Sequence, residues 1–535
     1  MPVSVSYPGV YVQELPNPVR PIVGVPTSIA AFVGIAPRGP VDDPVEVDSW
    51  SDYERNFGSL DPQAATLNPN VPLSYAVYLF FLNGGARALV VRNSDPADTT
   101  ATAAISGDIT LNANSPGKWA ESLTATVDTT NLFDPANQFN LTIKVNGDPS
   151  EFYTGLTPAN VAAKLASSRL VALDPTKTYK ALPKAGDTPF KAPAAPAAPA
   201  AAAPAPAAPA DAGGGGGGGG GGNPPAAPAA APAAAPAAGP PLPLGDPGAK
   251  TGIYALAKAD IFNMLCLPVS PQATLDPVTI LAPAVEFCKE RRAVLIVDPP
   301  STWSNITVGN AFQTVNGNPA LTASEEFLGY AAVYFPNLVI PGGQQVTPCG
   351  AIAGIWAATD TARGVWKAPA GTATGITGIT DLAAHVDDGE SGALNPIAVN
   401  ALRTMPVAGP VVWGARTMAG ADQRADQWKY IPVRRLALYI EESLRRGTQW
   451  VVFEPNDEPL WSSIRLNVTA FMNGLFRQGA FQGATPADAY LVKCDKDNNP
   501  QDQIDLGIVN ILVGFAPLKP AEFVIINIQQ QAGQA

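Results

Sequence analysis

The chain has 535 residues, of which 46% are hydrophobic and only 15% are charged, and its formal net charge is −12. The length predicts several domains, and the acidic balance excludes a general nucleic-acid-binding protein, which needs a basic face to neutralise phosphates. The low share of charged residues indicates a largely neutral surface, as in a protein that buries surface against copies of itself.

The N-terminal residues, Met1–Ser6, lack the basic and apolar regions of a secretory signal. The longest apolar runs, such as Ala293–Val297, have the length of strands rather than of membrane-spanning helices. We therefore expect a protein that folds in the bacterial cytoplasm and does not insert directly into a membrane.

The chain begins with an expected extended arm, residues 1–24. Small apolar and polar residues alternate there as in a strand, and Pro16, Pro18 and Pro21 follow, which remove ladder donors and keep the backbone extended. The strand residues are Val10, Tyr11, Val12, Gln13 and Glu14. A lone strand ahead of the first domain requires a partner sheet elsewhere.

An α/β domain is expected from residues 25–100 and again from 250–404. In the first part, the strand Ile29–Ile35, the aromatic-rich helix Leu73–Asn83 and the strand Ala88–Arg92 follow one another as in an α/β layer. In the second part, the helix Val278–Arg292 leads into the apolar strand Ala293–Asp298. The other elements expected there are a helix and a strand within Tyr254–Leu267, the helix Glu325–Tyr334 leading into the strand Ala332–Phe335, and the helix Ala351–Thr361.

Two segments of different composition interrupt this domain. Residues 101–186 are rich in Thr, Ala, Asn and Gly, with an alternating strand at Phe139–Val145 and a short helix at Pro158–Ser167, which predicts a small, mostly β inserted domain. Residues 187–249 contain Pro-Ala repeats on both sides of the ten glycines Gly213–Gly222. Such a composition cannot bury enough apolar surface to offset its ordering entropy, so we expect a disordered tether.

Residues 405–535 form an expected C-terminal domain. It contains the amphipathic helix Pro432–Arg446, a strand at Thr448–Phe453 and the long helix Glu458–Arg477, whose apolar residues share one face. Three strands are expected after them, at Ala489–Lys493, Leu506–Phe515 and Ala521–Ile528. The last strand contains Phe523, Val524, Ile525, Ile526, Asn527 and Ile528.

No catalytic, cofactor or metal site is predicted. The segment around Lys250 resembles a P-loop but has Ala249 where that motif requires glycine, and it follows no strand. His385 lies among carboxylates that could tune a base or bind a hard cation, yet no nucleophile motif or EF-hand spacing accompanies it, which favours a solvated loop.

The four cysteines are expected to be buried free thiols, because none has the spacing of a metal-binding pair. They are Cys266, Cys288, Cys349 and Cys494.

Several stretches resemble the contractile tail sheath family, which comprises phage tail sheaths and the sheaths of phage-tail-like contractile injection systems. The most specific are Arg434–Leu444 and Phe453–Trp461. The others are Tyr7–Glu14, Thr27–Gly34, Phe81–Arg92, Arg363–Gly371 and Leu394–Ile397. The resemblance covers roughly residues 1–100 and 250–535 and leaves out the insert.

The resemblance implies the α/β multidomain fold of a tail sheath, with the insert as an outer domain and the C-terminal domain facing an inner tube. It implies a structural subunit, without an active site, that polymerises as stacked six-fold rings and contracts to drive the tube through a target membrane. The terminal strands would be exchanged between subunits by β-augmentation. The partners would be the same chain, the tube, and the baseplate and cap proteins of a phage tail or of a released or cell-bound particle.

Four arginines on the helix Pro432–Arg446 are candidates for contact with the inner tube, as a basic strip that holds another polymer electrostatically. They are Arg434, Arg435, Arg445 and Arg446. The alternative is that Glu441 and Glu442 pair with the last two, as helix neighbours often do. The alternative functions are a baseplate or other component of the same machine, or a multidomain hydrolase or adhesin.

Overall fold

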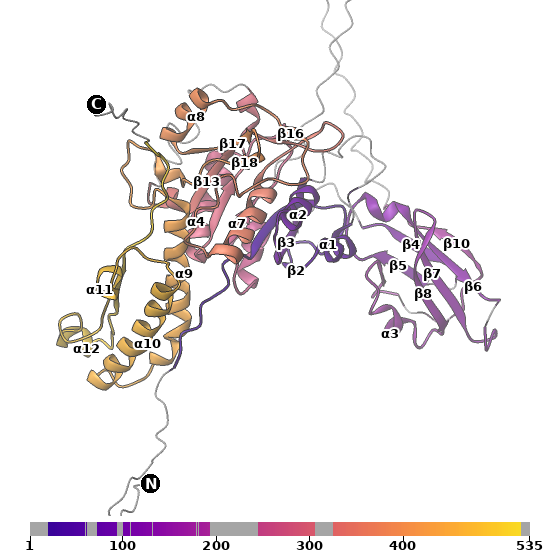
Figure 1. Cartoon of the computed structure of the whole chain (residues 1–535). Helices are drawn as coiled ribbons and strands as arrows, with labels where there is room; N and C mark the ends of the chain where they lie inside the picture. Colours follow the sequence, from indigo (N-terminus) through magenta and orange to yellow (C-terminus); the bar gives the residue numbers. More distant parts are fainter. Residues whose placement is uncertain are drawn as a thin grey trace, which may run out of the picture. The chain divides into compact units, whose positions relative to one another are not determined.

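The structure is a computed structural model that describes residues 20–58, 60, 72–93, 100–106, 109–130, 132–177, 179, 181–192, 244–304 and 325–525. It divides into two compact units (Figure 1). Unit 1 combines Met1–Pro96 with Gly239–Ala535, and unit 2 is Ala97–Ala238.

Unit 1 is built on an eight-stranded sheet in the order β18-β17-β13-β12-β11-β1-β3-β2. The six inner strands are parallel, and the two edge strands are antiparallel to their neighbours. The strands β1, β11, β12 and β13 are continuous buried runs rather than alternating ones, as expected for parallel strands covered on both faces. The strands are β1 (Ala30–Ile35), β2 (Val45–Val47), β3 (Ala88–Asn93), β11 (Met264–Cys266), β12 (Val294–Val297), β13 (Ala331–Phe335), β17 (Val399–Met405) and β18 (Gly409–Val412).

Helices pack against this sheet and share its core. They are α1 (Trp50–Phe57), α2 (Pro72–Leu82), α4 (Ala282–Arg291), α7 (Cys349–Arg363) and α8 (Asp388–Leu394). Three short strands, β14 (Leu338–Val339), β15 (Gln345–Val346) and β16 (Asp381–Leu382), form a separate small sheet.

The first turns of α2 and α7 lie beside the carboxyl ends of β1 and β11, the edge at which a parallel sheet often binds a ligand. The strand order reverses between β1 and β11, and such a switch point normally opens a crevice at the carboxyl ends of the strands. Here the first residue of α7, Cys349, hydrogen-bonds through its amide to Asp298 after β12 (2.8 Å). A side chain on Gly350 would overlap the backbone carbonyl of Ala76 in α2, so only glycine allows the two helices to approach this closely.

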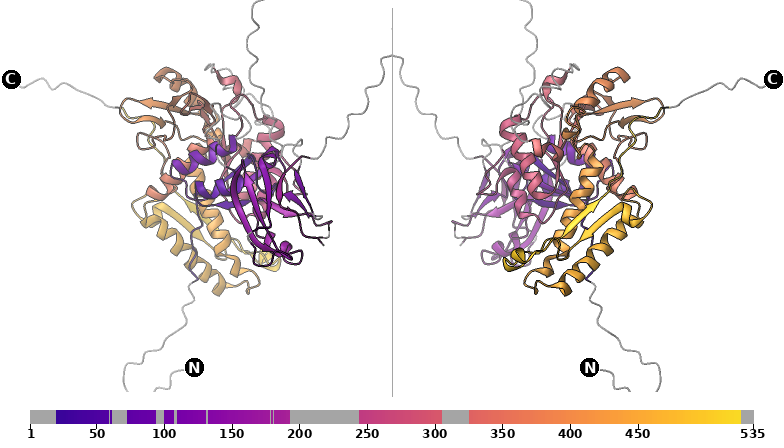
Figure 2. Two further views of the ribbon diagram at one scale, coloured as in Figure 1. Left: turned by 90° about the vertical axis from the view of Figure 1, so that its right-hand side faces the viewer. Right: turned by 90° about the vertical axis from the view of Figure 1, so that its left-hand side faces the viewer.

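The C-terminal part of unit 1 has a hydrophobic core of its own. The helices α9 (Ile431–Gly447) and α10 (Glu458–Arg477) pack with an antiparallel hairpin of β19 (Tyr490–Lys493) and β20 (Leu512–Phe515). Figure 2 shows these helices in orange and the hairpin in yellow. Two short helices, α11 (Pro486–Ala489) and α12 (Gln501–Asp505), complete this part.

Unit 2 is mostly β, as the sequence predicts. Its strands alternate buried and exposed residues, and both of its sheets enclose one core. One sheet has the order β10-β6-β7-β8 and the other β4-β5-β9. The elements are β4 (Thr102–Ile105), β5 (Ile109–Ala113), β6 (Leu123–Asp128), β7 (Phe139–Val145), β8 (Asp148–Leu156), α3 (Val161–Leu165), β9 (Val171–Leu173) and β10 (Gly186–Pro189).

One residue ties together the two ends of unit 1 between which the insert lies. The Asp42 amide donates to the carbonyl of Arg92 in β3 (3.0 Å), where the chain leaves the sheet. The Asp42 carboxylate accepts from the amide of Gly252 (2.7 Å), where the chain has returned. The segment that leaves unit 1 and the segment that returns to it are therefore both hydrogen-bonded to Asp42.

The structure corrects several sequence expectations. The strand expected at Thr448–Phe453 is a single 3-10 turn, Gln449–Val451, and no described strand pairs with it. Trp450 and Val451 pack against the C-terminal core, while Val452 and Phe453 are exposed. The strand expected at Leu506–Phe515 is confined to β20, and the helix expected from Tyr254 is the 3-10 segment Gly252–Lys258.

The expected tether begins later than residue 187. The strand β10 pairs with β6, so residues 187–189 belong to the sheet of unit 2. Residues 193–243, which contain most of the Pro-Ala-Gly sequence, lie outside the described residues.

Candidate subunit-coupling site

The residues considered for catalysis have structural roles or are solvated. Lys250 lies in an exposed turn, and the His385 side chain is 74% exposed, with Nε2 3.7 Å from Asp381. Asp387 caps α8 by accepting from the amide of Glu390 (2.7 Å).

The four cysteines are buried and free, as predicted. Burial is the main reason why the pKa of the Cys288 thiol is raised well above its ordinary value, which keeps it a neutral thiol. Within the described ranges, no group of three or more His, Cys, Asp or Glu side chains is placed to hold a metal ion. No helix in the described part of the chain is both long and apolar enough to span a bilayer.

The interactions that stand out instead hold the first and the last described segments of the chain within unit 1. At the N-terminal end, residues 20–28 run along α9 and α10 (Figure 1). The Arg20 amide donates to Asn467 of α10 (3.1 Å), and the Val25 amide donates to Ser443 of α9 (3.2 Å). Both acceptor residues are buried, so this segment, the N-terminal root, is held by hydrogen bonds protected from water.

Small residues allow the N-terminal root to lie close to the helix. A side chain on Gly24 would overlap the hydroxyl of Tyr439, and one on Gly447 would come within 2.6 Å of Ile22. The root therefore occupies a slot in α9 that tolerates no added methyl group at these two glycines.

A buried ion pair joins the N-terminal root to both parts of unit 1. Arg435 of α9 donates two hydrogen bonds to Asp360 of α7 (2.8 and 2.6 Å), and the two side chains are 4% and 2% exposed. The same guanidinium donates to the carbonyl of Thr27 (3.0 Å). Because the pair is bidentate and closed off from solvent, it fixes α7, α9 and the root relative to one another.

Arg434 is also buried, but its partners are aromatic rings. Its guanidinium carbon lies 3.7 Å from the ring centre of Tyr330 and 4.4 Å from that of Trp428. Burial is the main cause that lowers the pKa of Arg434, to about 10, and a guanidinium placed over two aromatic faces is stabilised as a cation.

Glu442 is the centre of a second charged junction. It accepts from Arg445 (2.6 and 2.8 Å) and Arg446 (2.7 Å) of its own helix, and from Arg292 at the end of α4 (3.2 Å). Arg446 also donates a hydrogen bond to the carboxylate of Asp260 (2.8 Å). Burial opposes ionisation of Glu442, but the arginine hydrogen bonds outweigh it and lower its pKa to about 2.

The C-terminal end is fixed by Arg416, which is 1% exposed. Its guanidinium forms a bidentate pair with Glu522 (2.8 and 2.6 Å) and a further bond to Asp422 (2.9 Å). The next three residues are 75–83% exposed and form no strand. Among the described residues, Glu522 is therefore the last that forms a buried ion pair, and we call it the C-terminal root.

The hairpin of β19 and β20 has no third strand among the described residues. Its inner residues pack on α10, while Leu491 and Leu512 on the outer face are 54% and 52% exposed. A two-stranded sheet is marginal alone and is normally stabilised by further strands or by helix packing.

The sequence-predicted site residues have different outcomes. Val10 to Glu14 and Ile526, Asn527 and Ile528 lie outside the described residues, so the exchange of strands stays a prediction. Of the four arginines, Arg434 and Arg435 are inside the subunit, where they cannot form an accessible strip. The expected pairing on α9 is confirmed for Glu442, whereas Glu441 lies 3.8 Å from Arg292.

Sequence reasoning missed Asp360, Arg416 and Glu522. Each has its partner from 75 to 106 positions away in the chain, and no local spacing reveals such a pair.

The sequence of unit 1 places the chain among the phage tail sheath proteins. The family model of the phage tail sheath protein central domain matches residues 245–418, and that of the phage tail sheath C-terminal domain matches 423–531. The chain belongs to the contractile tail sheath family.

Curated relatives agree with this assignment. The tail sheath protein of Vibrio phage KVP40 is 30% identical over 179 residues, 33% of this chain and 25% of the relative. That of Enterobacteria phage T4 is 26% identical over 177 residues, again 33% of this chain and 26% of the relative. The matched segment thus spans about a quarter of the length of these relatives.

Similar folds extend over nearly the whole chain. A chain of the anti-feeding prophage baseplate has a TM-score of 0.54 and 21% identity, over 99% of this chain and 100% of that one. A chain of the contracted sheath of an extracellular contractile injection system has a TM-score of 0.54 and 20% identity, over 99% of both chains. The sheath tail protein of Desulfitobacterium hafniense has a TM-score of 0.57 and 15% identity, over 91% of this chain and 93% of that one.

Proposed function

We propose that this chain is the sheath subunit of a contractile particle, which polymerises around an inner tube and contracts to drive the tube through a target membrane. The observation that carries the proposal is the family assignment together with two firmly held roots, at residues 20–28 and at Glu522. A polymer whose subunits move during contraction needs links that leave each subunit from a fixed point. No active site is required, because interface free energy stored at assembly performs the work.

The proposed links are the terminal strands. Residues 10–14 and 523–528 would add to the edges of the β19–β20 hairpin of neighbouring subunits, by β-augmentation. Each added backbone hydrogen bond contributes about 0.5–1.5 kcal/mol, so a strand of five residues makes a strong but reversible link. The partners would be the same chain, the inner tube, and the baseplate and cap proteins.

Purified protein should form rings or ribbed tubes in negative-stain electron microscopy. Removal of residues 1–14, or of residues 523–535 with Glu522 retained, should leave folded subunits that no longer polymerise. Polymerisation of both truncated chains at the concentration of the full chain would refute the strand links.

For the tube contact, the proposal retains Arg445 and Arg446, whose side chains are 46% and 29% exposed. Arg445→Glu should weaken co-sedimentation with tubes more than it lowers the thermal midpoint. The matched control is Arg55→Glu, because Arg55 makes a similar ion pair with Asp52 three positions away (2.7 Å) on α1. Equal loss of tube binding in both variants would contradict this role.

A baseplate component is the second candidate, because two chains of similar fold come from baseplate structures. Isolated particles separate the two functions: antibodies to unit 2 should label the whole length of a sheath, but only one end of a baseplate-bearing particle.

A further inference from the structure

The loop between α9 and α10 presents an exposed aromatic ring from a strained backbone. Phe453 is fully exposed and has a φ of 71°, in the left-handed region. Its neighbour Val452 is 63% exposed. A bulky residue is disfavoured in the left-handed region, and a fully exposed aromatic ring contributes no apolar burial to stability. Both features are therefore unfavourable in an isolated subunit.

The ring is nevertheless held by a fixed loop. Asn456 donates to the carbonyl of Ile508 (3.0 Å) and accepts from the indole N–H of Trp461 (2.8 Å), while Asp457 caps α10. The exposed carboxylate of Glu454 lies next to Phe453 in sequence. We name Val452, Phe453 and Glu454 the knob: an apolar tip with a negative charge beside it.

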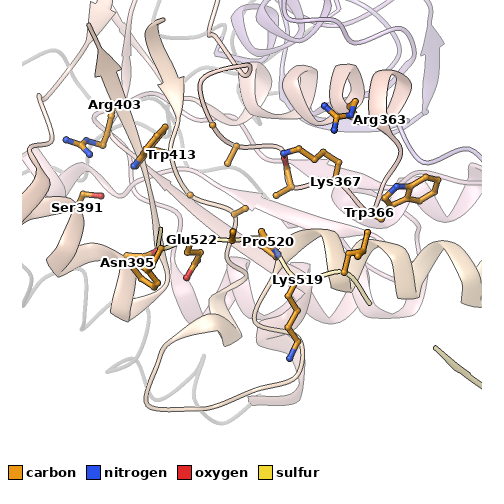
Figure 3. Close-up of a pocket in the computed structure, with 18 of the residues that line it drawn as sticks. Arg363, Trp366, Lys367, Ser391, Asn395, Arg403, Trp413, Lys519, Pro520 and Glu522 are labelled. Carbon is orange, nitrogen blue, oxygen red and sulfur yellow. The ribbon is translucent and has the colours of Figure 1, made fainter. Parts of the chain in front are cut away.

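A pocket of about 890 Å³ elsewhere in unit 1 has complementary chemistry (Figure 3). It lies between the loop after α7, the strand end near Trp413 and the C-terminal root, and it is large enough for a loop tip. We name it the socket. Its apolar residues include Trp366, Trp413 and Leu518, and its cations include Arg363, Lys367 and Lys519.

The socket has an excess of positive charge. Its two carboxylates are already used, since Asp388 pairs with Arg403 (2.7 Å) and Glu522 pairs with Arg416 (2.6 Å). Among the described residues, no carboxylate forms an ion pair with Arg363, Lys367 or Lys519. Burial, and then repulsion from Arg363, lower the pKa of Lys367, so an anion brought into the socket would be favoured.

We propose that the knob of one subunit docks into the socket of a second copy of this chain. Their charges are opposite, both present large apolar side chains, and the full exposure of Phe453 means that it does not occupy the socket of its own chain. Two different patches that pair between copies make a heterologous contact, which builds rings or open helices rather than closed dimers. The inference rests on the proposed function, because it names one interface of the sheath polymer.

The test measures the critical concentration for polymerisation by sedimentation. Phe453→Asn should raise it about 30-fold, as expected when a central aromatic anchor is removed, without lowering the thermal midpoint, because Asn tolerates the left-handed region. Phe133→Ala is the matched control, since Phe133 is equally exposed but lies in unit 2. Glu454→Lys and Lys367→Glu should each weaken assembly, and the two changes together in one chain should restore it.

Mixing gives a second, independent result. A knob variant, Phe453→Asn, and a socket variant, Lys367→Glu, retain one good patch each, so at concentrations above the critical value of the parent chain but below those of the variants their mixture should form pairs rather than polymers. Unchanged polymerisation of Phe453→Asn and Lys367→Glu, beside a polymerising parent chain, would overturn the inference alone. Failure of the parent chain to polymerise would overturn the proposed function.

Discussion

The substitution Asp360→Asn tests whether the buried ion pair holds unit 1 together. It keeps the shape of the side chain but leaves the Arg435 guanidinium charged and without its carboxylate in a site that is 4% exposed. Removal of one partner of a buried pair costs about 3–5 kcal/mol, because the other charge remains away from water. For a unit of roughly 390 residues, with an unfolding entropy of about 2.1 cal/mol/K per residue, this corresponds to a fall of about 4–6 °C in the thermal midpoint.

The matched control is Asp388→Asn. Asp388 pairs with Arg403 at a similar distance, 2.7 Å, but its side chain is 96% exposed. An exposed pair contributes about 0–1 kcal/mol, so the control should shift the midpoint by no more than about 1 °C. Equal midpoints for the two variants, measured by calorimetry below the critical concentration, would refute the assignment. Hydrogen exchange should also accelerate at Val25 and its neighbours in Asp360→Asn only.

Three other changes probe the packing and the charged groups. Because the pKa of Glu442 is lowered, its ionised form stabilises the fold above pH 4.5, and this contribution is lost as the pH falls toward 2. The decrease in thermal midpoint on acidification should therefore be shallower in Glu442→Gln than in the parent chain. Burial raises the pKa of Asp298 to about 6, so its protonated form stabilises the fold below pH 4, and this contribution is lost as the pH rises through 6. Asp298→Asn should remove the resulting dependence of the thermal midpoint on pH between 4 and 6. Gly350→Ala, which overlaps Ala76, should lower the midpoint by several degrees, whereas Gly392→Ala, with open space around it, should not.

The strand–helix alternation and the family of the chain were predictable from local sequence. Continuous apolar runs such as Val294–Val297 and the aromatic-rich, apolar sequence of α2 can be recognised without tertiary information, and the insert is marked by its composition. The segment Thr448–Phe453 was wrongly predicted to be a strand, because an apolar run alone does not show whether a partner strand exists. Arg434 and Arg435 were misplaced for a similar reason: charge predicts exposure, and only tertiary structure supplies an aromatic cage or a buried carboxylate.

The double attachment at Asp42 makes unit 2 an exchangeable module. The chain leaves and re-enters unit 1 at one fastened point, so the strands of the large sheet pair with each other whatever lies between residues 93 and 252. Foreign domains with neighbouring termini should be accepted there at little cost, as at other closely spaced insertion points. A graft made once in the gene would then be repeated on every subunit, which would make the chain a scaffold for dense, regular display of enzymes or binding domains.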